Sequence, residues 1–188
     1  MTIPEIKIPD QRSKRFIFIP FCLICQAFQA QGIVRYGNRA TIKPIVEEIL
    51  RHDINIIQMP CPESQLGEYE QGLKRGPKGI EKYDTSEFRE VCQHLATETA
   101  KMIKAILAND YEIVAILGIE YSPSCSTKLQ YSRRGVFHRP GLFIEALQNQ
   151  LAKEKIEIPF LGINRRGMKK SLDELGRLIN QQKNLLDL

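Results

Sequence analysis

Three of the five cysteines follow runs of apolar residues that are typical of buried strands. Cys22, Cys61 and Cys125 each come within a few residues of the end of such a run. Thiolates are the preferred ligands of soft metal centres, and an iron–sulfur cluster needs several of them around one centre. The alternative is that each cysteine only packs in the core, as free cysteine often does. Three thiols in matching positions favour a metal or iron–sulfur site.

The other two cysteines differ in their surroundings. Cys92 lies four residues after Phe88 on the apolar stripe of a predicted helix, which indicates core packing. Cys25 lies three residues after Cys22, so it is either a fourth ligand or a bystander in the same apolar loop. The bystander interpretation is the one we favour.

Oxygen-bearing side chains stand next to two of the three thiols. Glu63 comes two residues after Cys61, and Ser122 and Ser124 come just before Cys125. A carboxylate beside a metal centre can act as a general base on water, and hydroxyls can pass a proton. The alternatives are a solvated loop acid and serines that serve a proline turn. Their clustering beside candidate ligands favours the chemical roles.

The elements that position these residues alternate between strands and helices along the chain. Apolar runs predict strands, and apolar residues at helical spacing predict helices. Two helix starts carry a capping-box pattern, Asp84 with Glu87 and Ser171 with Glu174. The predicted strands are 15–19, 54–59, 113–119 and 158–163, and the predicted helices begin at Thr41, Asp84, Gly141 and Ser171.

This alternation predicts an α/β fold, in which a parallel sheet carries helices on both faces in a Rossmann-like arrangement. Ligands bind such sheets beyond the carboxyl ends of the strands. We therefore expect the cluster site there, in the loops that follow the first three strands. Two of these loops, 62–82 and 121–140, are long and irregular. The whole chain, 1–188, is predicted to be one domain, with 1–14 as a flexible leader.

Composition excludes several classes of protein. The chain has 43% hydrophobic and 26% charged residues, which is ordinary for a globular domain and not for a disordered, collagen-like or coiled-coil chain. The basic residues 12–15 before the apolar run 16–28 resemble a signal peptide. That run, however, contains Pro20 and two cysteines, and it is too short to cross a bilayer. We expect a cytoplasmic protein with no membrane contact.

Four segments in order resemble the thiouracil desulfidase family, formerly a domain of unknown function. They are Cys22, the sequence QMPCPE at 58–63, GLKRGPKGIEKYD at 72–84 and SPSC at 122–125. The matches run from about residue 16 to residue 162, and the likeness is greatest to the longer single-domain relatives. The pair CPE and SPSC in this order is fairly specific, whereas neither motif alone would be.

The resemblance implies a [4Fe–4S] cluster with three cysteine ligands, Cys22, Cys61 and Cys125, and one open iron. That iron would take the sulfur of a thiocarbonyl substrate, and Glu63 would activate the attacking water. Ser122 would help proton transfer and Ser124 would assist. The sulfur would leave as hydrosulfide and C=S would become C=O without net redox, so the implied enzyme is a desulfidase for a thiobase or thionucleotide.

Three positions depart from the family pattern and bear on the substrate. Ser126 stands where the motif continues with Gly, Tyr121 where a small residue is common, and Cys25 where a polar residue is expected.

Two groups of basic residues also bear on the partner. Because both follow strands, we expect them at one pocket, where they would bind a phosphate, a carboxylate or RNA; the alternative is a solvated surface. The two groups are Lys128, Arg133, Arg134, His138 and Arg139, and Arg165, Arg166, Lys169 and Lys170.

A non-catalytic module that stores or senses iron–sulfur or zinc is the alternative function. The sequence does not indicate the oligomeric state.

Overall fold

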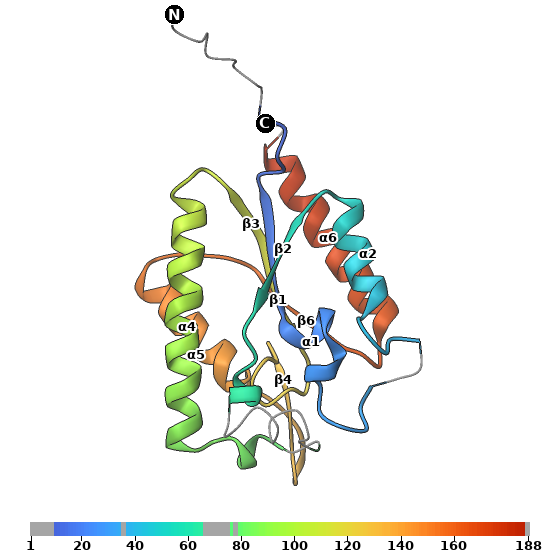
Figure 1. The fold of residues 1–188 in the computed structure, drawn as a ribbon, viewed down its shortest axis with the longest axis vertical. Coiled ribbons are helices and arrows are strands. Elements are labelled where there is room, and N and C mark those ends of the chain that lie inside the picture. The colour runs from blue at the N-terminus through green and yellow to red at the C-terminus, as the bar shows by residue number, and fades with distance from the viewer. Residues whose placement is uncertain (1–9, 35–36, 66–75, 77–78, 187–188) are drawn as a thin grey trace, which may run out of the picture.

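The protein is an α/β sandwich with one central sheet, shown in Figure 1. The computed structural model describes residues 10–34, 37–65, 76 and 79–186, with the backbone alone over 182–186. The strands of the central sheet are β1 (Arg15–Pro20), β2 (Asn55–Met59), β3 (Glu112–Ile119) and β6 (Phe160–Ile163). The main helices are α2 (Lys43–Arg51), α4 (Ser86–Leu107), α5 (Leu142–Lys153) and α6 (Met168–Leu186).

All four strands of this sheet are parallel, in the order β2-β1-β3-β6. The chain goes from β1 to β2 on one side and then returns to β3 on the other side of β1. The order therefore reverses between β1 and β3, and such a reversal opens a crevice at the carboxyl ends of the strands. The prediction of a parallel sheet is confirmed.

Two hydrophobic clusters, one on each face of the sheet, make up the core. Phe18 and Ile116 pack with residues of α4 and α5, whereas Ile17 and Ile19 pack with residues of α2 and α6. Neighbouring residues of a strand point to opposite faces, so β1 contributes to both clusters. Figure 1 shows α4 and α5 on one side of the sheet and α2 and α6 on the other. Helices on both faces are thus confirmed.

Three predicted helix starts are wrong by a few residues. The cap of α4 is Thr85, whose Oγ1 accepts the N–H of Phe88 at 3.2 Å. Asp84 instead forms an ion pair with Arg89 at 2.6 Å. The helix expected from Thr41 begins at Lys43.

The last helix begins at Met168, before the expected Ser171. Ser171 lies inside it, and its Oγ accepts the N–H of Asn164 at 2.9 Å. Its side chain therefore ties the start of the preceding loop, directly after β6, to α6, in place of capping the helix.

The segment 121–140, expected to be irregular, contains an antiparallel hairpin of β4 (Leu129–Ser132) and β5 (Gly135–His138). Its strands are short and lack an apolar run, so the pattern gave no strand signal. A short helix α1 (Phe21–Ile24) and the 3-10 turns η1 (Gln26–Phe28), η2 (Pro62–Gln65) and η3 (Ile80–Lys82) complete the described elements.

The ends of the chain and part of one loop lie outside the described residues. These include 1–9 of the expected leader and most of 72–78 in the GLKRGPKGIEKYD segment. Residues 10–14 have no helix or strand, but the carbonyl of Lys14 accepts the N–H of Glu112 at 2.9 Å. Within the described chain, every helix is too short or too polar to cross a membrane.

Candidate functional site

The three candidate ligands lie where the sheet order predicts, each after the carboxyl end of a different strand. Cys22 is in α1, directly after β1, and is half-buried. Cys61 follows β2 by two residues, and Cys125 lies in the turn after β3; both are buried. Parallel strands that end at one edge therefore bring residues that are far apart in the sequence to one side of the molecule.

The segments that carry Cys22, Cys61 and Cys125 lie close enough for the first two thiols to affect the third. The pKa of Cys125 is raised well above its ordinary value, first by burial and then by the thiols of Cys61 and Cys22. The hydroxyl of Ser124 acts in the opposite direction. Among the described residues, no group of three or more His, Cys, Asp or Glu side chains is placed so that it could hold a single metal ion. The cysteine ligands of a cubane cluster each bind a different iron atom, so they are spaced differently from the ligands of one ion.

Glu63 is a buried carboxylate that joins the loop after β2 to the loop after β3. It lies in η2 and is 8% exposed. Its Oε1 accepts a hydrogen bond from Ser124 Oγ at 2.6 Å and one from Ser122 Oγ at 3.3 Å. The two hydroxyl oxygens are 3.2 Å apart. The three residues predicted to act together are therefore in mutual contact.

The same serines hold the candidate ligand Cys125. Ser122 Oγ accepts the backbone N–H of Cys125 at 3.1 Å, and Ser124 Oγ is 3.4 Å from Cys125 Sγ. The turn is packed so closely that a Cβ on Gly141 would collide with the backbone of Ser124, and a Cβ on Gly118 with the Cys125 carbonyl. Only glycine permits these approaches, which fix the turn against β3 and the start of α5.

Tyr121 and Ser126, which flank the segment 122–125, have structural roles in this turn. Tyr121 has φ +69°, a left-handed conformation that costs a residue with a side chain about 1 kcal/mol or more. Its N–H donates to the carbonyl of Leu129 at 2.8 Å. Ser126 is fully buried, and its Oγ accepts from Gln130 Nε2 at 2.6 Å. Both residues thus attach the β4–β5 hairpin to the turn.

Cys92 packs in the core as predicted, but it also lies close to the site. The pKa of its thiol is raised from 9.0 to about 12, mainly by burial and then by Glu63, with a smaller contribution from Cys61. Arg89 acts in the opposite direction. The apolar stripe of α4 indicated that Cys92 faces the sheet, but not which end of the sheet it faces.

Cys25 ends α1 and is half-buried. Its backbone N–H donates to the carbonyl of Phe21 at 3.0 Å and its carbonyl accepts the N–H of Phe28 at 3.1 Å. These contacts place its backbone in the turn between α1 and η1.

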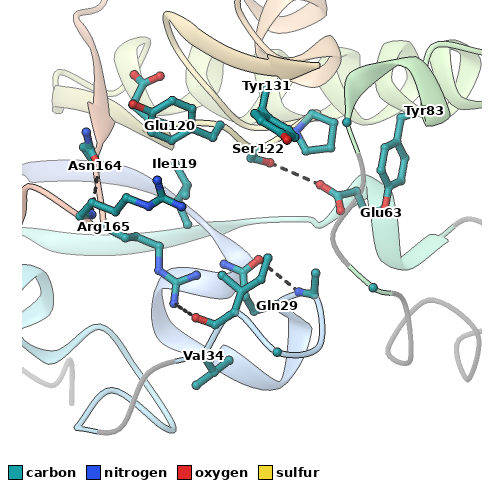
Figure 2. A pocket seen from close by; sticks show the side chains of 18 of the residues that line it. Gln29, Val34, Glu63, Tyr83, Ile119, Glu120, Ser122, Tyr131, Asn164 and Arg165 are labelled. Atoms are coloured by element: carbon teal, nitrogen blue, oxygen red, sulfur yellow. Dashed lines mark hydrogen bonds between the residues drawn. The ribbon is translucent and has the colours of Figure 1, made fainter. Parts of the chain in front are cut away.

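A cavity of about 790 Å³ opens beside the buried carboxylate. Glu63 and Ser122 line it, whereas Ser124 is not among its lining residues. No cysteine of the described chain lines it either. Figure 2 shows Ser122 directed toward Glu63 on one side of the cavity, and Asn164 and Arg165 on the other. Of the three predicted catalytic residues, Glu63 and Ser122 are thus the ones that a molecule in this cavity would touch.

Most of the other lining residues were not predicted. They come from loops and from the hairpin, where residue type alone does not indicate which side chains face a cavity. The sequence feature that could have pointed to these lining residues was the length of the loops that follow the strands. The lining residues that were not singled out from the sequence include Gln29, Ile33, Val34, Glu120, Tyr131, Val136 and Asn164.

Of the two basic groups, only the second reaches this cavity within the described chain, through Arg165 and Arg166. In the first group, Arg139 forms ion pairs with Asp84 at 3.3 Å and Glu145 at 3.1 Å. The other members, Lys128, Arg133, Arg134 and His138, are exposed on the hairpin or beside it.

Arg165 is engaged by the protein itself. Its Nη2 donates to Gln26 Oε1 and to the carbonyl of Ile33, both at 3.2 Å. Gln26 in turn donates through Nε2 to the carbonyl of Cys22. Arg165 therefore connects the loop after β6 to the segment that carries the first candidate ligand.

Comparison with known proteins gives one distant relative. No protein-family model matches the chain, and no solved structure matches it. The chain is similar to an uncharacterized protein of Methanocaldococcus jannaschii, with 27% identity over 147 residues, which are 78% of this chain and 84% of that protein. That relative is itself uncharacterized, so the similarity assigns no function.

Proposed function

We propose that this protein is a cytoplasmic, [4Fe–4S]-dependent desulfidase that converts the C=S group of a thiolated base or related heterocycle to C=O without net redox. The observation that carries the proposal is the buried carboxylate of Glu63. It accepts hydrogen bonds from Ser122 and Ser124 at the sheet edge to which three strands bring cysteines. Burial of a carboxylate is tolerated when it is hydrogen-bonded, and one that also lines a cavity is placed to exchange a proton with a bound molecule, which favours a chemical role.

The donor set fits the proposed cluster. Cys22, Cys61 and Cys125 come from three separate segments, and soft thiolates are the ligands that iron–sulfur clusters take. Thiolates gathered in a buried place repel each other, and a positively charged centre between them offsets that repulsion. When bound, a cluster with three cysteine ligands supplies a Lewis acid that polarises the C=S bond.

Glu63 and Ser122 would do the proton chemistry. Both line the cavity, and Glu63 is held with Oε1 toward the two hydroxyls. Glu63 takes a proton from water as the water oxygen bonds to the thiocarbonyl carbon. The C–S bond then breaks, and the products are an oxo compound and hydrosulfide, so water supplies the oxygen and the protons. Ser122 passes the proton, and Ser124, which does not line the cavity, is a positioning residue.

A Glu63→Gln variant tests the base. Glutamine has nearly the same shape but cannot take the proton, so we expect iron and sulfide content to stay at the wild-type level. Desulfuration of 2-thiouracil should fall by about 100-fold or more, the range of a lost general base. The exposed carboxylate Glu90 on α4 supplies the matched control, Glu90→Gln, which should remain active. Unchanged turnover in Glu63→Gln would refute the mechanism.

Iron and acid-labile sulfide per chain, after anaerobic reconstitution, test the ligands. We expect about four of each in the wild type, as a cubane requires. Cys125→Ser should lose them, and Cys25→Ser, the half-buried neighbour of α1, should keep them. A wild type that binds zinc or no metal would refute the desulfidase. A wild type that holds the cluster without turning over any thiocarbonyl would favour the storage or sensing module.

A further inference from the structure

Within the part of the chain that the structure describes, the exposed large apolar side chains are concentrated at the cavity. An exposed large apolar group is costly in water, and a cluster of them marks a binding surface. The described chain has six exposed large apolar side chains. Two of them, Leu50 on α2 and Met102 on α4, do not line the cavity. The other four line it: Ile33, Val34, Tyr131 and Val136.

These four residues belong to two arms on opposite sides of the cavity. Ile33 and Val34 lie in the loop after η1, and Tyr131 and Val136 lie on the β4–β5 hairpin. Figure 2 shows Val34 and Tyr131 on opposite sides, with Ser122 and Gln29 between them. The cavity therefore has an aliphatic wall and an aromatic wall, with the candidate catalytic hydroxyl between the two.

The hairpin turns Tyr131 toward the cavity because its two faces have different contacts. Gln130 is fully buried, and its Nε2 donates to the carbonyl of Ser122 at 2.8 Å. Side chains alternate along a strand, so Tyr131 and its cross-strand partner Val136 project from the opposite face. They are 54% and 59% exposed. The anchor of Gln130 on Ser122 thus leaves the ring of Tyr131 on the face of the hairpin that lines the cavity.

Each arm is fixed at its base by a charged residue that lines the same cavity. Glu120 Oε2 accepts the N–H of Leu129, the first residue of β4, at 2.7 Å. Arg165 donates to the carbonyl of Ile33 at 3.2 Å. These two side chains already have partners in the protein, so they hold the walls of the cavity in place.

We propose that Tyr131 is a specificity-determining residue that selects a planar ring by stacking on it, with Ile33 and Val34 as the opposite wall. An aromatic face beside the cavity suits a heteroaromatic ring, whereas an open-chain thioamide has no ring and offers a much smaller planar face to stack. The choice of a thiocarbonyl as the reacting group rests on the proposed function. The recognition of the ring does not, and it can be measured without turnover.

The test is the affinity of the anaerobically reconstituted protein for uracil, measured by equilibrium dialysis. Uracil has the planar ring but no sulfur, so it reports binding alone. Base–aromatic stacking is worth enough that Tyr131→Ala should weaken binding about tenfold. Tyr131→Phe keeps the ring and should bind within about twofold of the wild type. Met102→Ala, which removes a similarly exposed apolar side chain from α4, should bind as the wild type does.

A second measurement separates this inference from the proposed function. For 2-thiouracil, kcat/KM should fall about tenfold in Tyr131→Ala, mainly through KM, while kcat/KM for thioacetamide stays unchanged. Equal uracil affinity of Tyr131→Ala and the wild type would overturn the inference, as would a wild type that does not bind uracil. Tyr131-dependent uracil binding without any desulfuration would refute the proposed function and leave the inference standing.

Discussion

The loops after β3 and after β1 deliver candidate ligands in different ways. After β3, the consecutive residues Ser124, Cys125, Ser126 and Thr127 are all buried. After β1, the four-residue α1 buries only Leu23 and leaves Cys22 half-buried. Densely packed segments open rarely, whereas segments with few buried contacts open at a low cost in free energy. Close packing therefore holds the segment that carries Cys125, whereas hydrogen bonds such as that from Gln26 to the Cys22 carbonyl hold the segment that carries Cys22.

The largest effect should come from breaking the packing after β3. In Gly141→Ala, the new Cβ would collide with the backbone of Ser124, so α5 and the turn must move apart. We expect the free energy of unfolding to fall by about 3 kcal/mol, the upper range for an overpacked core. Urea denaturation measures this loss.

Gly176→Ala is the matched control for Gly141→Ala. Gly176 lies inside α6, and its Cβ would meet only Glu48 Oε1 at an ordinary 3.5 Å. Alanine favours a helix over glycine, so this variant should gain about 0.5–1 kcal/mol. A Gly141→Ala variant as stable as the wild type would show that the turn after β3 is not rigid.

The buried side of the site should also respond to alkaline pH. Burial raises the pKa of Cys92 from 9.0 to about 12. Between those values the unfolded chain has released this proton and the folded chain has kept it, so stability falls as pH rises. The loss is about 1.4 kcal/mol per pH unit for one thiol, and it is absent below pH 9.

Urea denaturation of metal-free protein at several pH values between 8 and about 10.5 measures this slope. Cys92→Ala removes the thiol, so its slope should be shallower than that of the wild type, although Cys125 still contributes. Identical slopes would mean that Cys92 is not buried as an uncharged thiol in the folded chain.

The smallest effect should come from loosening the loop after β1. Arg165→Met removes hydrogen bonds to Gln26 and to the carbonyl of Ile33, and should cost about 1 kcal/mol. The reactivity of Cys22 should respond more specifically than the overall stability. In metal-free protein, iodoacetamide should modify Cys22 faster than in the wild type, while the rate at the buried Cys125 stays the same.

Lys169→Met is the control for charge alone. Lys169 is an exposed cation of the same basic group, so its loss should leave both alkylation rates unchanged. Mass spectrometry of peptides after timed alkylation measures the rates. Equal acceleration at Cys22 and Cys125 in Arg165→Met would indicate global opening and would remove the distinction between the two loops.

The alternation of apolar runs and helical patterns determined the fold class. A strand covered on both faces must be apolar throughout, as 113–119 is, so the sequence itself reports this kind of burial. The hairpin was missed because its strands are only half-buried. Tyr131 and Val136 face the cavity, Gln130 is buried on polar partners, and no apolar alternation results.

Helix starts show a similar limit. Asp84 with Glu87 and Thr85 with Phe88 are both plausible starts for α4, one residue apart. Asp84 has ion-pair partners, Arg89 and Arg139, and Arg139 lies far away in the sequence. Long-range ion pairing therefore decided between two locally acceptable caps.

For the site, the sequence by itself determined which chemical groups are present and at which edge of the sheet they gather. This follows because parallel strands all end on one side, so Cys22, Cys61, Cys125, Glu63 and the two serines could be assigned to one rim. The tertiary structure alone decided which atoms meet. It placed Glu63 Oε1 within hydrogen-bond distance of both Ser122 and Ser124, brought Cys92 near Glu63 and formed the cavity from several loops and the hairpin. Those contacts depend on how loops of different length pack together, and no local pattern encodes that packing.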